Sequence, residues 1–305
     1  MRRLVPIALI SVVLWTAAAR EAHAEGPGLE RQTVAIQVEG PAPVGGTVYG
    51  APTRPPLHPF DRKAVKFSVN VYGWLTDVSG ESFTDGQGTS FEIPFEELAN
   101  YVNAGFMGYA EVRWRRWSLA LDSYVAELKG DAPTGTRLLD ARWTVDNLLL
   151  DVRLGYTVWE RCLGYAHWGG CVAKRTIGVD ALIGARYWKQ DLGVELSTPL
   201  LPGRGLPLAS SEEWWDPYVG ARLRWDVAKR WMVSLYGDVG GFGLGDASEL
   251  TWQIQGGVGF RLTRQFHVFL GYRVLDLDRT TGSGATKNGT TTSQHGPLLG
   301  AGIAF

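Results

Sequence analysis

Residues 250–262 alternate strictly between apolar side chains and small or polar ones. Leu250, Trp252, Ile254 and Val258 lie on one face of an extended chain, and Thr251 begins the opposite face, which continues through 253–261 with Gln, Gly and Arg. Successive side chains of a strand point to opposite faces, whereas an amphipathic helix repeats every three to four residues. The segment is therefore predicted to be a strand with one apolar and one polar face.

The same alternation recurs along most of the chain. It predicts ten strands at about 65–76, 104–115, 117–128, 144–158, 176–188, 215–226, 230–241, 250–262, 266–277 and 296–305. Each is close to the 9–11 residues that a tilted strand needs to cross a bilayer. Short and long connections alternate, with 159–175 as a long exception on the short-turn side. The predicted fold is all-β, a transmembrane antiparallel up-and-down β-barrel of about ten strands, with eight or twelve as alternatives.

Composition is typical of such a barrel. The chain has 39 Gly, 13 Trp, 20% charged residues and a mean hydropathy of −0.07. Strands that place every second residue in a polar lumen keep the average hydropathy low. A net charge of −1 argues against a nucleic-acid partner. Tryptophans near strand ends are expected to form two interfacial girdles, namely Trp114, Trp117, Trp143, Trp159, Trp188, Trp214, Trp215, Trp225 and Trp231.

The first 62 residues read as a targeting segment and a leader. Residues 1–24 have a basic start, an apolar run and a small-residue end, which predicts a signal peptide cleaved between Ala24 and Glu25. An uncleaved membrane anchor is the alternative. Residues 25–62 are rich in Pro and Gly and predict a flexible periplasmic leader. The barrel is assigned to residues 63–305.

Two cysteines, Cys162 and Cys171, enclose a short loop. An exported chain folds in an oxidising compartment, so a disulfide between them is expected. Two unpaired thiols are an alternative, as is a metal site with His167, which lacks a fourth ligand. No cofactor is expected.

If the apolar faces point outwards, charged side chains line the lumen. Unpaired charges there would be unfavourable, so acids and bases from different strands are expected to form ion pairs, either as a packed polar core or as the lining of a selective pore. The predicted lumen network comprises Lys66, Glu111, Arg113, Asp122, Asp151, Arg153, Asp180, Arg186, Arg222, Arg224, Asp238, Arg261 and Arg273.

Catalysis and adhesion are two other functions that the sequence could serve. Past the predicted signal the histidines are His58, His167, His267 and His295, and only His295 is expected at the outer side, with Ser293 beside it. A barrel enzyme acting on lipid or peptide near His295 is the alternative. Adhesion would depend on the outer loops. Residues 94–102 predict a short helix, which would be a lid, a plug or an element on the rim of the barrel. Residues 280–294 predict a mobile polar tip.

Several segments carry a resemblance to a known group. WDPYVGARLRWDV, SLYGDVGGFGLG, LTWQIQGGVGFRL, FLGYRVLDLD, GPLLGAGIAF and VNVYGWLTDVSG look like Gram-negative outer-membrane β-barrel proteins of a small-porin-like family without assigned activity. The resemblance covers residues 65–305. It implies a bacterial outer-membrane location, no known cofactor or catalytic residue, and a role for the terminal Phe305 as an insertion signal.

The expected function is that of an outer-membrane barrel, structural or a narrow pore for small solutes, without catalysis. The expected partners are outer-membrane lipid and lipopolysaccharide, and the barrel-assembly machinery during insertion. No nucleic-acid partner is expected, and the sequence does not indicate an oligomeric state.

Overall fold

The computed structural model describes residues 65–133, 140–163, 175–197 and 206–305. The predicted signal peptide, its cleavage site at Ala24 and Glu25, and the leader lie outside these residues. The strands are β1 (Lys66–Trp74), β2 (Asp77–Thr84), β3 (Gln87–Ile93), β4 (Val102–Trp114), β5 (Trp117–Pro133), β6 (Asp140–Cys162), β7 (Thr176–Ser197), β8 (Leu206–Asp226), β9 (Trp231–Gly241), β10 (Leu250–Arg261), β11 (Phe266–Thr281) and β12 (Asn288–Ala304).

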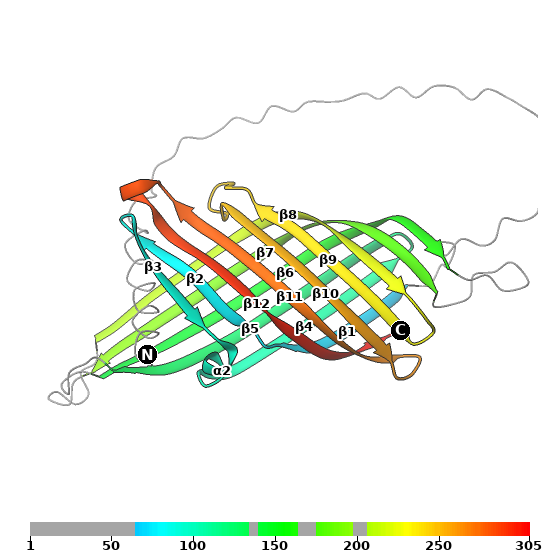
Figure 1. Ribbon diagram of the computed structural model, residues 1–305, viewed down its shortest axis with the longest axis horizontal. Helices are drawn as coiled ribbons and strands as arrows, with labels where there is room; N and C mark the ends of the chain where they lie inside the picture. Colours follow the sequence, from blue (N-terminus) through cyan, green and yellow to red (C-terminus); the bar gives the residue numbers. More distant parts are fainter. Residues whose placement is uncertain (1–64, 134–139, 164–174, 198–205) are drawn as a thin grey trace, which may run out of the picture.

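Strand β1 and strands β4 to β12 form a closed antiparallel ring (Figure 1). β1 pairs with β4, each following strand pairs with the next one up to β12, and β1 also pairs with β12 to close the wall. Phe67 and Phe305 exchange two backbone hydrogen bonds of 3.2 and 2.8 Å at this closure. We call the end that carries these two residues the terminal end, and the opposite end the loop end. The predicted ten-strand up-and-down barrel is confirmed.

A hairpin of β2 and β3 extends the wall at the loop end and was missed by the sequence analysis. It pairs along β12, with Phe83 opposite Gly289 and Asp77 opposite His295. Its turn is Asp85-Gly86, with φ angles of 47° and 74°, the left-handed conformation that a two-residue type I′ hairpin turn requires. A four-residue helix, α2 (Phe95–Leu98), then leads to β4. It is shorter than the helix predicted over 94–102.

The strands extend further at the loop end than their alternation predicts. Strand β6 has 23 residues, β7 has 22 and β8 has 21, about twice what a crossing needs. Residues 280–294, expected as a mobile tip, are mostly strand: β11 runs to Thr281, β12 starts at Asn288, and a 3₁₀ turn, η2 (Gly284–Thr286), joins them. The expectation of a mobile tip was wrong because β12 pairs there with β2 as well as β11.

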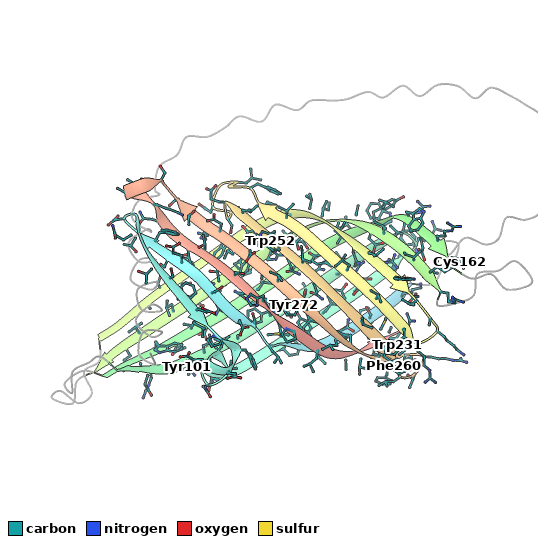
Figure 2. All side chains as sticks on the ribbon, viewed as in Figure 1. Tyr101, Cys162, Trp231, Trp252, Phe260 and Tyr272 are labelled. Carbon is teal, nitrogen blue, oxygen red and sulfur yellow. The ribbon has the colours of Figure 1, made fainter. Side chains whose placement is uncertain are left out.

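An apolar belt surrounds the ring. Leu119, Ile183, Ile254 and Leu270 are each more than half exposed on the outside of the wall, which is the arrangement a strand needs when its outer neighbour is hydrocarbon. Aromatic rings mark the terminal end of the belt: Figure 2 shows Trp231 and Phe260 together there, with ring centroids 4.9 Å apart. No helix among the described residues is long and apolar enough to cross a bilayer.

The predicted tryptophan girdles need one correction. Trp143, Trp188 and Trp214 are 2–4% exposed and lie inside the barrel rather than at the membrane surface. The reason is strand parity: Trp214 and Trp215 are adjacent, so they point to opposite faces, and Trp215 is the exposed one, at 52%. The interior tryptophans cap the lumen at the loop end.

Candidate functional site

Within the described residues the strands gather their buried charge in the lumen, where the side chains form three levels. Starting from the terminal end, we name them the Asp180 cluster (Glu111, Arg113, Asp180, Arg222, Arg224), the Arg186 cluster (Asp122, Asp151, Arg153, Arg186, Asp238, Arg273) and the aromatic cap (Trp74, Leu149, Trp188, Trp214, Leu275, Leu277, Leu298). In all three, the side chains come from the positions along each strand that face inwards, which are every second residue.

In the Asp180 cluster, three guanidinium groups surround one carboxylate. Arg224 Nε lies 2.8 Å, Arg222 Nη2 2.9 Å and Arg113 Nη2 3.4 Å from Asp180 Oδ2. Glu111 pairs with Arg113 at 2.9 Å and also with Arg222. Because Glu111 is on β4 and Arg222 on β8, with three strands between them around one side of the ring, this contact crosses the lumen.

The Arg186 cluster fills the middle of the lumen. Arg186 is fully buried and its Nη2 lies 2.9 Å from Asp238 Oδ2 and 3.3 Å from Asp151 Oδ2. Arg153 Nε reaches the other oxygen of Asp151 at 3.1 Å. Buried guanidinium groups that bind carboxylates in this way are strongly interdependent, because removing one partner leaves the other charge unpaired in a medium of low polarity.

The same cluster ties opposite walls together. Arg153 on β6 and Arg273 on β11 lie 3.5 and 3.8 Å from Asp122 on β5. The Tyr72 hydroxyl, from β1, donates to Asp122 Oδ1 at 2.7 Å, and Arg273 Nη2 donates to Gln253 Oε1 at 2.8 Å. Asp151, Arg186 and Gln253 have no solvent exposure, and Arg273 has 1%.

The aromatic cap closes the lumen above these charges. Trp188 and Trp214 stack with centroids 5.7 Å apart and an interplanar angle of 12°. Their indole N–H groups donate to Asp216 Oδ2 at 2.8 and 3.2 Å. The loop between β9 and β10 joins them, because Ser248 donates to Asp216 through its backbone N–H, at 2.7 Å, and its hydroxyl, at 2.9 Å. Asp216 and Ser248 are fully buried.

Two residues of the predicted lumen network belong to neither cluster. Lys66 and Arg261 lie at the rim of the terminal end, where both border a cavity. Arg261, the last residue of β10, forms an ion pair with Asp226, the last residue of β8. The remaining predicted network residues are those that form the two charged clusters.

Four tyrosines of the lumen were not singled out by sequence. Tyr72, Tyr109, Tyr218 and Tyr236 all donate to carboxylates of the two clusters, for example Tyr218 Oη to Asp151 Oδ1 at 2.6 Å. A signal was present: Tyr236 precedes Asp238 by two residues and Tyr109 precedes Glu111 by two, so strand parity places each on the lumen face.

The other predicted site residues have separate positions. His295 is at the outer surface of β12, and its Nδ1 lies 3.2 Å from the Tyr272 hydroxyl. Within the described residues, no hydrogen bond joins His295 to Ser293. Cys162 is 6% exposed at the end of β6. Cys171 lies outside the described residues, so the Cys162–Cys171 disulfide stays a prediction. No group of three or more His, Cys, Asp or Glu side chains suited to a metal ion occurs in the described part of the chain.

Comparison with known proteins yields no family model and no curated relative that matches. Among solved structures, the chain is similar to the outer membrane protease OmpT of Escherichia coli, at 9% identity and a TM-score of 0.46, covering 80% of this chain and 98% of OmpT. It is also similar to Ail, the attachment invasion locus protein of Yersinia pestis, at 11% identity and a TM-score of 0.32, covering 79% and 99%. A third similar structure is CarO of Acinetobacter baumannii, at 9% identity and a TM-score of 0.25, covering 76% of this chain and 98% of CarO. These low scores assign no activity to the chain.

Proposed function

We propose that this protein is a bacterial outer-membrane barrel with a closed lumen, serving as a structural barrel rather than an open diffusion pore. The observation that carries the proposal is the Arg186 cluster. Its side chains join strands on opposite sides of the ring and are almost entirely excluded from solvent. A ten-strand barrel is also well below the 16–18 strands of general porins, which enclose a wide aqueous channel.

Two features support the membrane placement. The ring has an apolar outer belt and an ionic interior, the reverse of a soluble protein. The signal peptide predicted for residues 1–24 would export the chain, and the even number of ring strands places both ends of the wall on one side. We therefore propose that the terminal end faces the periplasm and that lipid and lipopolysaccharide surround the belt.

Closure of the lumen is tested by planar-bilayer recordings of refolded protein. We expect no steady unitary conductance from the chain that starts at Glu25 or from a chain that starts at residue 63, because the Arg186 cluster and the aromatic cap block the lumen without the leader. An open general porin, reconstituted in parallel, shows that the bilayer detects channels, and a heat-modifiable shift on gels shows that both chains are folded. A steady conductance from the full mature chain would refute the proposal. Conductance from the shorter chain alone would assign the closure to residues 25–62 instead.

The geometry gives the enzyme alternative no support. His295 faces the hydroxyl of Tyr272, with nearly parallel rings at 6.5 Å, and the residue pairs with Asp77 and Val274 in the strand ladders. A general base has to lie within hydrogen-bond reach of a nucleophile. Replacing His295 by Ala is therefore expected to leave the function of the barrel unchanged.

A further inference from the structure

A cavity of about 430 Å³ lies in the terminal half of the lumen. It reaches from rim residues such as Lys66, Arg261 and Phe305 inwards to Asp122 and Arg153 of the Arg186 cluster. Its volume is within the range of small-molecule sites in proteins, which are concave and lined by a few polar groups among apolar ones. Because the Arg186 cluster closes its inner end, the cavity is a blind vestibule.

The lining of the vestibule carries an excess of positive charge. The Asp180 cluster contributes three arginines and two carboxylates, whereas at the rim Arg261 is paired with Asp226. The Arg186 cluster, by contrast, holds three arginines and three aspartates and is balanced. The excess therefore belongs to the vestibule. A charged wall of a concave site inside a low-dielectric body concentrates ligands of the opposite sign.

The carboxylates of this lining are already engaged, whereas Arg224 keeps its Nη1 group available to a ligand. Asp180 accepts from three guanidinium groups and from the Thr157 hydroxyl. A guanidinium carries five N–H donors in a planar fork that fits carboxylate or phosphate oxygens. Arg224 uses its Nε and Nη2 on Asp180 and is the most exposed arginine of the cluster, at 27% for its side chain. The lining is thus suited to an anion and unsuited to a cation.

The lining next to the arginines leaves room for an uncharged group, since β9 pairs with β8 and places Ser234 opposite Arg224 in the strand ladder. Strands β9 and β10 present Ser234, Gly257 and Gly259 to the cavity, and Phe269 and Tyr236 add aromatic surface. The lining therefore changes from arginines on β8 to small residues on β9 and β10. A ligand with an oxyanion at one end and an apolar ring or chain at the other matches both parts of this lining.

We propose that the vestibule binds a small organic anion, a carboxylate or phosphate attached to an apolar group, entering from the terminal end. That the vestibule is closed at its inner end rests on the proposed closure of the lumen. Its charge and its volume do not depend on that closure. If bilayer recordings showed a conducting wild-type protein that still bound the anion, the closed barrel would be refuted and the site would stand as a subsite of a conduit.

The test uses isothermal titration of the refolded mature chain in a zwitterionic detergent and a phosphate-free buffer. Phenyl phosphate is the probe, and phenyltrimethylammonium is its cationic counterpart of similar size. We expect saturable binding of phenyl phosphate that weakens as salt is raised, weaker binding of inorganic phosphate, and no binding of the cation. Equal affinity for phenyl phosphate and phenyltrimethylammonium would overturn the proposal.

Two variants and one control locate the site. Arg224→Gln is expected to weaken phenyl phosphate binding at least tenfold, and Ser234→Phe to abolish it by filling the cavity. Arg279→Gln, at the loop end and outside the cavity, is expected to change affinity less than twofold. Unchanged affinity in both folded vestibule variants would overturn the proposal. Binding seen only after removal of residues 25–62 would also overturn it, by making the leader the occupant of the vestibule.

Discussion

Asp216 is the most informative residue to change, because one buried carboxylate joins the barrel wall, the stacked indoles and an outer loop. Its Oδ1 accepts the backbone N–H of Ser248, and its Oδ2 accepts the hydroxyl of Ser248 and the indole N–H groups of Trp188 and Trp214. In Asp216→Asn, one of these oxygens becomes an NH₂ group. Either orientation of the amide then places a donor against a donor.

The magnitude follows from this geometry. The less unfavourable orientation keeps the indole bonds and loses the bond to the Ser248 backbone N–H, which leaves a buried donor unsatisfied at a cost of about 1–3 kcal/mol. The remaining bonds weaken from charge-assisted to neutral, which adds about 1 kcal/mol each. Burying an amide instead of a charge offsets part of the loss. We expect the free energy of unfolding to fall by about 2–3 kcal/mol.

Urea titration of the refolded barrel measures the change, and hydrogen exchange at the Ser248 amide locates it. A local loss of 2–3 kcal/mol corresponds to exchange that is roughly 30–150 times faster. Glu249→Gln is the matched control, since it makes the same isosteric change at an exposed neighbour. If Asp216→Asn lowered stability by less than about 0.5 kcal/mol, as expected for the surface control, or left the Ser248 amide protected, the role assigned to Asp216 would be wrong.

Two further predictions concern the closure of the wall. A Cβ at Gly300 would lie 2.6 Å from the Val71 carbonyl oxygen and 2.5 Å from the Phe269 ring, whereas a Cβ at Gly73 would meet nothing within 4 Å. Gly300→Ala should therefore lower the yield of folded barrel on heat-modifiability gels. Gly73→Ala is the control and should leave the yield unchanged. Equal yields would contradict this reading of the β1–β12 contact. Phe305→Ala should reduce the amount of barrel recovered in outer-membrane fractions of cells without changing refolding in detergent, and an equal effect in both would mean that Phe305 acts through packing and not as an insertion signal.

Most of what the sequence could predict came from strand parity, the alternation of successive side chains between the two faces of a strand. It identified the ten ring strands and the face of each charged residue, since a period of two is local and needs no knowledge of neighbours. The Asp85-Gly86 turn was equally local and could have been used, because this dipeptide is a strong hairpin signal. Its flanking strands were missed because they pair beyond the apolar belt, where apolar alternation is no longer required.

Partners across the lumen could not be predicted in the same way. Arg222 and Glu111 are 111 residues apart in sequence, and their contact depends on how the strands are staggered around the ring. Parity gives the face of a side chain but not its height along the barrel axis. It therefore could not separate the balanced Arg186 cluster from the positively charged lining of the vestibule, nor place Trp188 and Trp214 as a stacked pair.

The pairing of Phe67 with Phe305 has a consequence for biogenesis. The two sides of the final seam are made at the start and at the end of the ring's synthesis, so the cylinder stays open for as long as any strand is missing. Every incomplete chain has two edge strands with unpaired backbone groups, which could pair with other chains. We therefore expect the contact between β1 and β12 to form only after the last strand of the ring has been made.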